Sequence, residues 1–95
     1  MVSNMKEECL KIIEHFGVNN QQRKLQEEIF ELQEAITKFE AGVGDIQEVE
    51  EEFVDVSLIL RQFMEHYEMD TIKLSLLSKM KVERTIERIE SGYYK

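Results

Sequence analysis

The chain contains no proline, and its four glycines stand at positions 17, 42, 44 and 92. Proline breaks helices and glycine commonly ends them, so this spacing predicts long, uninterrupted helices. Apolar residues recur at helical spacing between the glycines. The expected helices run from a cap at Ser3 or Asn4 to about Phe16, from a cap at Asn19 or Asn20 to near Ala41, from a cap at Asp45, and from Asp70 to about Ser91. The sequence therefore predicts an all-α, four-helix bundle-like single domain over residues 1–95.

The second and third expected helices are joined only by the short segment around Gly42 and Gly44. A connection this short makes consecutive helices pack antiparallel, so these two should form a central pair. Glu48 stands three residues after Asp45, as in a capping box. The apolar stripes expected to pack inward are Leu25, Ile29, Leu32, Ile36 and Phe39 in the second helix, and Val49, Phe53, Val56, Leu60, Phe63 and Tyr67 in the third.

Composition limits the classes of partner. A net charge of −8 argues against a nucleic-acid-binding protein and against a polybasic membrane-binding protein. No apolar run approaches the ~20 residues of a membrane span, and no secretory signal is evident at the start. The single cysteine, Cys9, excludes an intrachain disulfide and fits a cytoplasmic protein. Because so short a chain buries a modest core, we expect a homo-oligomer, either a dimer or a tetramer.

Two pairs of carboxylates point to chemistry. Glu28 and Glu31 are three residues apart in the second expected helix, and Glu52 and Asp55 are three apart in the third. Residues three apart share a helix face, and the antiparallel pairing places both pairs at nearly the same height. Two unit charges ~5 Å apart repel by roughly 3 kcal/mol at an effective dielectric of ~20. A hard divalent cation such as Mg²⁺ would relieve this repulsion.

The spacing alone is a weak signal, because the chain has 20 acidic residues and many such pairs are solvated. Orientation separates these two pairs from the others. Glu28 falls between Leu25 and Leu32 on the apolar side of its helix, and Asp55 is the only charged residue in FVDVSLIL, so we expect both to be close to buried. Charged side chains are almost never buried unless paired or metal-bound. A buried network with lysine or arginine is the alternative to a metal site.

The sequence resembles the MazG-like, all-α nucleoside triphosphate pyrophosphohydrolases from about Phe16 to Arg88. The resemblance lies in the motifs E-x-x-E and E-x-x-D, which read Glu28-Ile29-Phe30-Glu31 and Glu52-Phe53-Val54-Asp55 within KLQEEIFEL and EEEFVDV. It implies that Glu28, Glu31, Glu52 and Asp55 bind Mg²⁺, or Mn²⁺ in its place. It also implies hydrolysis of a nucleoside triphosphate substrate to the monophosphate and pyrophosphate. The attacking water would be activated either by a metal or by a carboxylate, for which Glu27 and Glu31 are the candidates.

Basic residues for the phosphates are expected at Lys24, one turn before Glu28, and at Lys81, Arg84 and Arg88 in the fourth helix. Lys24 has the alternative of pairing with Glu28, and the fourth-helix residues that of favourable charges near a helix C-terminus. The stretch Lys79-Met80-Lys81-Val82-Glu83-Arg84 lacks the asparagine that many MazG-like proteins carry there. This difference leaves the phosphate contacts and the choice of substrate open.

Two other functions stay open at this point. Phosphoribosyl-ATP pyrophosphohydrolase shares the fold and the metal chemistry. A non-catalytic helical interaction module is the alternative of a different class, with the acidic residues paired to Lys24, Arg61, Lys81 or Arg84.

Overall fold

The computed structural model describes residues 5–94, and helix is the one kind of regular secondary structure among them. The helices are α1 (Lys6–Phe16), α2 (Val18–Glu40), α3 (Ile46–His66) and α4 (Thr71–Glu90). The predicted all-α class and the four-helix organisation are therefore confirmed. The caps expected at Ser3 and Asn4 lie outside the described residues. Within residues 5–94, no helix combines the length and the low polarity that crossing a membrane requires.

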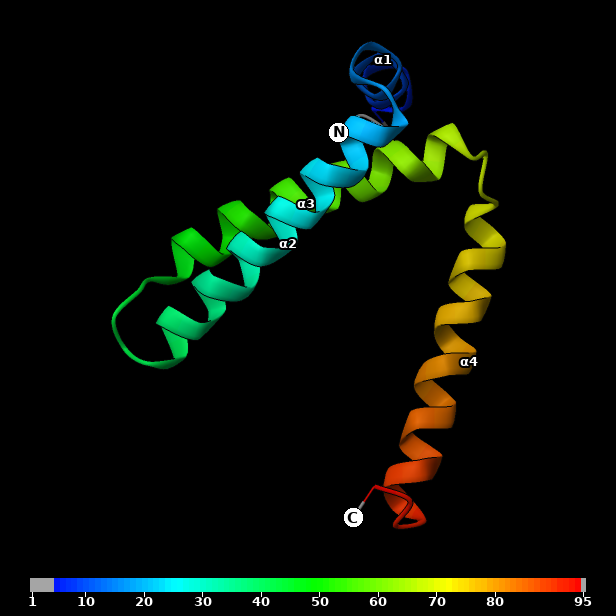
Figure 1. Cartoon of the computed structure of the whole chain (residues 1–95). Helices are drawn as coiled ribbons and strands as arrows, with labels where there is room; N and C mark the ends of the chain where they lie inside the picture. Colours follow the sequence, from blue (N-terminus) through cyan, green and yellow to red (C-terminus); the bar gives the residue numbers. More distant parts are fainter. Residues whose placement is uncertain (1–4, 95) are drawn as a thin grey trace.

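Helices α2 and α3 form the antiparallel central pair, hereafter the α2–α3 hairpin (Figure 1). The turn between them uses Gly42, whose φ of 79° lies in the region that favours glycine. The Asp45 side chain then begins α3, since its Oδ1 accepts a hydrogen bond from the Glu48 backbone nitrogen at 2.9 Å. The predicted cap at Asp45 is confirmed. Gly42 and Asp45 together define the turn that reverses the chain between α2 and α3.

Loss of the Asp45 cap should destabilise the hairpin. Replacement of an aspartate N-cap by alanine typically costs about 1 kcal/mol, because a helix N–H group loses its acceptor. We expect Asp45→Ala to lower the free energy of unfolding by about that amount, measured by urea denaturation. Asp45→Asn is the matched control, because asparagine caps equally well and should change stability little. Equal losses in both variants would contradict the assigned cap.

The start of α2 differs from the prediction. The expected caps, Asn19 and Asn20, both lie inside the helix, which begins at Val18 directly after Gly17. Gly17 has a φ of 89°, so a glycine-specific conformation turns the chain between α1 and α2 without a side-chain cap. The Asn20 amide instead donates to the Phe16 carbonyl oxygen at 2.7 Å, which satisfies the end of α1.

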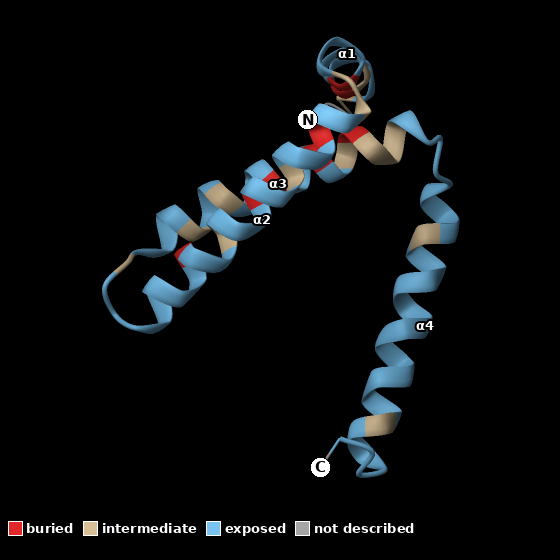
Figure 2. Cartoon of the chain, in the orientation of Figure 1, coloured by how far each residue is buried: buried red, intermediate tan, exposed pale blue. Residues whose placement is uncertain are grey.

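The core lies where α1, α2 and α3 meet (Figure 2). Cys9 and Ile13 of α1 are buried there. The other buried apolar residues are Ala35 on α2, with Val56 and Ile59 on α3. Three buried polar side chains join them: Gln21, Glu28 and Gln62. This is a small apolar core for 95 residues.

The predicted inner stripes of the hairpin are only partly correct. On α2 the buried line runs through Gln21, Glu28 and Ala35, which are seven residues apart. The line along which α2 packs on α3 therefore lies beside the predicted apolar stripe and does not coincide with it. Several stripe residues are exposed as a result, namely Ile29, Ile36, Phe39, Phe53, Leu60 and Tyr67.

Helix α4 extends away from the other three (Figure 1). It begins at the predicted Asp70 cap, whose Oδ1 accepts from the Ile72 nitrogen at 2.9 Å. It ends before Gly92, where the Tyr93 nitrogen donates to the Arg88 carbonyl oxygen at 2.8 Å. No Cα atom of α4 lies within 8 Å of a Cα atom in another helix of the described chain.

Candidate metal centre

Three carboxylates from α2 and α3 converge at the middle of the hairpin. One oxygen each from Glu28, Glu31 and Glu52 lies within 4.8 Å of the other two. Glu28 is buried with 5% of its surface exposed, Glu52 is half-buried and Glu31 is exposed. The antiparallel pairing thus brings three of the four predicted ligands together, and the cluster opens toward solvent on the Glu31 side.

Two of the carboxylate oxygens in this cluster are buried and have no hydrogen-bond partner: Oε2 of Glu28 and Oε2 of Glu52. The other Glu28 oxygen, Oε1, accepts from Lys24 Nζ at 3.1 Å. The pair with Lys24 therefore satisfies only half of the Glu28 carboxylate. Buried polar atoms in proteins are nearly always partnered, so a proton, a water molecule or an ion would satisfy these two oxygens.

The electrostatics of the cluster are unfavourable without a cation. Burial raises the pKa of Glu52 to about 7, and the Glu31 carboxylate adds to the shift by repulsion and by a shared hydrogen bond. Glu28 and Asp55 raise the same pKa further. On the other side of the cluster, the hydrogen bond to Glu28 raises the pKa of Lys24 and so keeps it charged. This arrangement of carboxylates favours the binding of one proton, or of one cation in its place.

The cluster fits a small divalent ion in donor type and nearly in dimension. Mg²⁺ takes oxygen ligands at 2.0–2.1 Å in octahedral geometry. Two ligands on opposite sides of such an ion are therefore about 4.2 Å apart. The three oxygens lie within 4.8 Å of one another, so they would move inward to bind one ion together. Glu28, Glu31 and Glu52 are thus the residues that would hold the ion.

Asp55 stands apart from the other predicted ligands. It is exposed, so the expectation that it would be close to buried is wrong. The reason is the orientation of α3, which directs Glu52, Val56 and Ile59 toward α2 and leaves Asp55 at the side of the hairpin. It is still close enough to raise the Glu52 pKa, and it lines the adjoining pocket, so its role as a ligand stays a prediction.

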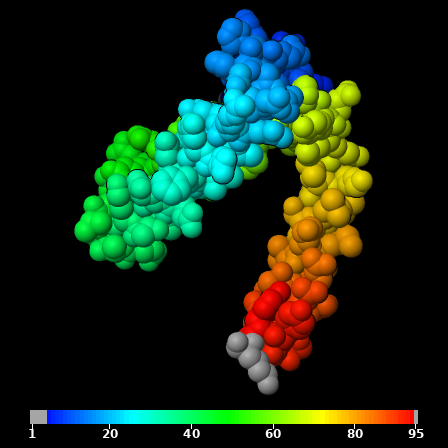
Figure 3. All heavy atoms as spheres, in the orientation of Figure 1, coloured from blue at the N-terminus to red at the C-terminus, as the bar shows by residue number. Residues whose placement is uncertain are grey.

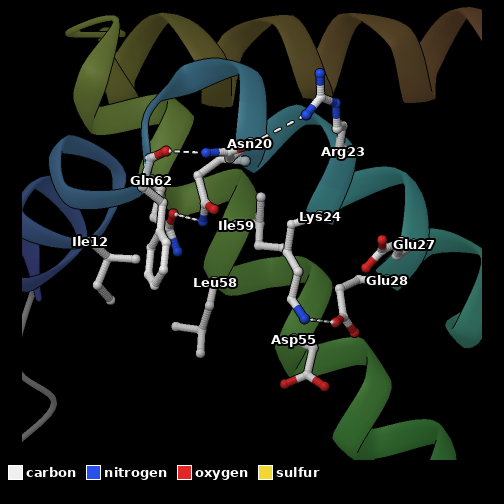
Figure 4. Close-up of a pocket in the computed structure, with 12 residues that line it drawn as sticks. Ile12, Asn20, Arg23, Lys24, Glu27, Glu28, Asp55, Leu58, Ile59 and Gln62 are labelled. Atoms are coloured by element: carbon white, nitrogen blue, oxygen red, sulfur yellow. Dashed lines mark hydrogen bonds and ion pairs between the residues drawn. The ribbon is translucent and has the colours of Figure 1, made fainter.

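A pocket of about 650 Å³ adjoins the carboxylates (Figure 4). Its apolar wall is formed by Ile12, Phe16, Leu58 and Ile59, and its polar rim by Asn20, Gln21, Arg23, Lys24, Glu27, Glu28, Asp55 and Gln62. Helix α1 supplies the first two of these residues, so the pocket exists because α1 lies across one end of the hairpin. Glu27, one of the two predicted bases, stands at its rim, and the other, Glu31, belongs to the cluster.

A buried amide pair at this pocket escaped the sequence analysis. Gln21 Nε2 donates to Gln62 Oε1 at 2.7 Å, and both side chains are buried. A signal was present in the sequence, because Gln21 precedes Glu28 by seven residues and so occupies the same line of α2. Arg23 and Asn20, at the rim of the same pocket, were also missed.

The predicted phosphate-binding residues divide into two groups. Lys24 pairs with Glu28, which is one of its two predicted roles, and it also lines the pocket, where its role in phosphate binding stays a prediction. Lys81, Arg84 and Arg88 belong to α4, which makes no contact with the hairpin within the described chain. The Arg88 guanidinium instead lies 4.9 Å from the centre of the Tyr93 ring. A phosphate role for these three residues stays a prediction.

Comparisons of the chain with protein-family models, with curated proteins and with solved structures found no match.

Proposed function

We propose that this protein is a divalent-metal-dependent nucleoside triphosphate pyrophosphohydrolase of the MazG-like type. The observation that carries the proposal is the pair of buried, unpartnered oxygens on Glu28 and Glu52 beside Glu31. A non-catalytic module with salt-bridged acids would partner these oxygens with basic side chains. Lys24 pairs with the other Glu28 oxygen, Oε1, and with neither of these two, so ion pairing accounts for part of the cluster and leaves the rest to a cation.

The adjoining pocket supports a nucleotide as the substrate. Its volume of about 650 Å³ is in the range of small-molecule sites, which span roughly 300–1,000 Å³. An apolar wall with buried amides at one end suits a planar base. Carboxylates and Lys24 at the other end suit a metal-bound triphosphate. The chain would act in the nucleotide pool of the cytoplasm.

The chemistry follows from these positions. A divalent ion held by Glu28, Glu31 and Glu52 would supply positive charge for the phosphate oxygens and acidify a bound water. Lys24 would bind a phosphate oxygen at the pocket rim. Glu31 or Glu27 would accept a proton from the water that attacks the α-phosphorus. The new bond joins the water oxygen to that phosphorus, and the broken bond is the α–β anhydride, whose bridging oxygen leaves with pyrophosphate.

Release of pyrophosphate from a panel of nucleotides tests the proposal. The panel should contain ribo- and deoxyribonucleoside triphosphates together with phosphoribosyl-ATP, which the related activity would select. We expect at least one triphosphate to yield equimolar monophosphate and pyrophosphate with Mg²⁺ or Mn²⁺, and no product with EDTA. Release of orthophosphate alone, or no product from any member, would refute the proposed reaction.

Metal affinity should depend on pH through Glu52. A proton and a cation compete for this carboxylate, whose pKa is about 7. The apparent affinity for Mg²⁺ should weaken by about tenfold for each pH unit below 7 and level off above it. Calorimetric titration at pH 6, 7 and 8 measures this dependence. An affinity that is the same at all three values would contradict the assignment of Glu52 as a ligand.

A further inference from the structure

The buried amide pair Gln21–Gln62 is a part of the pocket that the proposed reaction does not use. Only 6% of the Gln21 surface and 4% of the Gln62 surface are exposed, and both residues line the pocket. Burial of amides costs free energy unless they are hydrogen-bonded, and two apolar side chains of the same shape would fill the place without this cost. Packing of α2 on α3 therefore does not account for the amides.

The hydrogen bond between the two side chains satisfies only half of their amide groups. Gln21 Nε2 donates to Gln62 Oε1 at 2.7 Å. Gln21 Oε1 and Gln62 Nε2 have no hydrogen-bond partner within residues 5–94. Unlike Oε2 of Glu28 and of Glu52, these two atoms are not fully buried, so a ligand in the pocket can reach them. The pair thus presents one acceptor beside one donor.

The amide pair lies two helical turns from the carboxylates. Gln21 is seven residues before Glu28 on α2, and Gln62 is seven residues after Asp55 on α3. At a rise of ~1.5 Å per residue, this spacing is about 10 Å along the hairpin. Figure 4 shows the same order, with Gln62 at one end of the pocket and Glu28 with Asp55 at the other. A nucleotide with its phosphates at the carboxylates would extend its base toward the amide pair.

Helix α1 covers the amide end of the pocket with an apolar surface. It packs on both helices of the hairpin and lies against the start of α2 in the space-filling view (Figure 3). Its Phe16 side chain lines the pocket, and 52% of the Phe16 surface is exposed. Bases stack readily on exposed aromatic rings, so Phe16 offers a surface for the face of a base whose edge meets the amides.

The amide pair can exchange its donor and its acceptor without losing its internal hydrogen bond. A half-turn about the last side-chain bond of glutamine exchanges nitrogen for oxygen and leaves the shape nearly unchanged. When both amides turn together, Gln62 donates to Gln21, and the free atoms become a donor on Gln21 and an acceptor on Gln62. Keto bases present a ring N–H beside a carbonyl oxygen, and amino bases present a ring nitrogen beside an amino group. The pair can match either pattern.

We propose that the Gln21–Gln62 pair binds the hydrogen-bonding edge of a nucleobase stacked on Phe16, and that joint turning of the two amides admits keto and amino bases alike. This role rests on the proposed function, in which the substrate is a nucleotide. The pocket then requires a base with a free edge and distinguishes little between uracil and cytosine, or between hypoxanthine and adenine.

Binding of nucleosides to the metal-free protein tests the base site apart from hydrolysis, because nucleosides carry no phosphate. In heteronuclear NMR spectra recorded with EDTA, the side-chain amide signals of Gln21 and Gln62 should shift on titration with uridine, cytidine, inosine and adenosine. The dissociation constants within each keto–amino pair should agree to within about tenfold, the contribution of about one hydrogen bond. No shift with any of the four, or a larger preference within a pair, would overturn the proposal.

Methylated nucleosides show whether the base edge makes the contact. The ring N–H of the edge is absent from 3-methyluridine and 1-methylinosine, whereas 5-methyluridine carries its methyl group elsewhere. We expect the first two to bind at least about tenfold more weakly than the unmodified nucleosides, and 5-methyluridine to bind at least as well as uridine. Equal binding of 3-methyluridine and 5-methyluridine would rule out recognition of the edge.

The double variant Gln21→Met/Gln62→Met separates base binding from packing. It leaves no buried amide without a partner, so it should keep the melting temperature of the wild type while binding uridine at least about tenfold more weakly. Gln22→Met, at an exposed position of α2, is the control and should bind uridine normally. Normal uridine binding by the double variant would show that the amides are only structural. The methylated nucleosides are tested on the wild-type chain, so they decide the question even if the double variant unfolds.

The base site and the hydrolase can fail separately. Nucleoside binding without pyrophosphate release from any triphosphate would refute the hydrolase and keep the base site. Equally fast pyrophosphate release from the triphosphates of uridine and 3-methyluridine would refute the base site and keep the hydrolase.

Discussion

Replacing Glu52 with glutamine should raise the melting temperature of the metal-free protein at pH 8. The folded protein holds a proton on Glu52 up to a pKa of about 7, whereas an ordinary glutamate releases it near 4.5. The stability that this group contributes is therefore present below pH 4.5 and lost as the pH rises through 7. Glutamine keeps the shape without the charge. The difference between variant and wild type should accordingly be small at pH 5 and large at pH 8.

The same substitution should remove the response to the cation. Mg²⁺ at ~100 times its dissociation constant should stabilise the wild-type protein by roughly 2.7 kcal/mol. The Glu52→Gln variant should show no such increase. It should also lose more than ~100-fold in pyrophosphate release, because even outer partners of metal ligands are worth 10–100-fold.

Glu50→Gln is the matched control for Glu52→Gln. Glu50 is exposed on the same helix, and the substitution changes the net charge by the same amount. We expect Glu50→Gln to keep the wild-type melting temperature at pH 5 and pH 8 and to retain the stabilisation by Mg²⁺. Thermal melting followed by circular dichroism, with and without Mg²⁺, gives all of these values. A Glu52→Gln variant less stable than wild type at pH 8 would favour a paired, structural carboxylate.

Truncation of Ile13 should have the largest effect on stability of any single change in α1. Ile13 is only 1% exposed and packs α1 against the hairpin. It is one of few buried apolar residues. Isoleucine-to-alanine substitutions in cores cost about 2–5 kcal/mol, against a total of about 5–15 kcal/mol for a typical domain. Ile13→Ala should therefore remove a large part of the free energy of unfolding, measured in urea.

Ile12→Ala is the control for Ile13→Ala, because it removes the same atoms from the neighbouring residue, which is 40% exposed. Ile12→Ala should lower the free energy of unfolding much less than Ile13→Ala does. Since Ile12 lines the pocket, its loss should instead weaken nucleotide binding. Equal destabilisation by the two substitutions would mean that α1 is held differently from the arrangement described.

The sequence predicted the hairpin and the caps of α3 and α4 well because these depend on local chemistry. Asp45 and Asp70 cap helices through their own side chains, and the short turn around Gly42 leaves no alternative to antiparallel packing. The cap of α2 was wrong because Gly17 made a side-chain cap unnecessary. Residue type shows which side chains are able to cap a helix. The conformation of the preceding turn determines whether one of them does so.

The carboxylate cluster was predictable in part for a related reason. Spacing placed Glu28, Glu31 and Glu52 at one height on adjacent helices, and the structure brings them together. The rotation of each helix about its axis was not predictable, because the seam runs through Gln21, Glu28 and Ala35 and not through the most apolar line. That rotation exposes Asp55 and buries the Gln21–Gln62 pair.

The central claim is that Glu28, Glu31 and Glu52 share one divalent cation. Titration of the protein with Mn²⁺, followed by loss of the electron paramagnetic resonance signal of free Mn²⁺, tests it most directly. We expect the wild-type chain and Glu50→Gln to take up the ion at a site that Mg²⁺ competes for, and Glu52→Gln to leave the signal of the free ion unchanged at the same concentrations. Equal uptake by Glu52→Gln and wild type, or no uptake by either, would contradict the assignment.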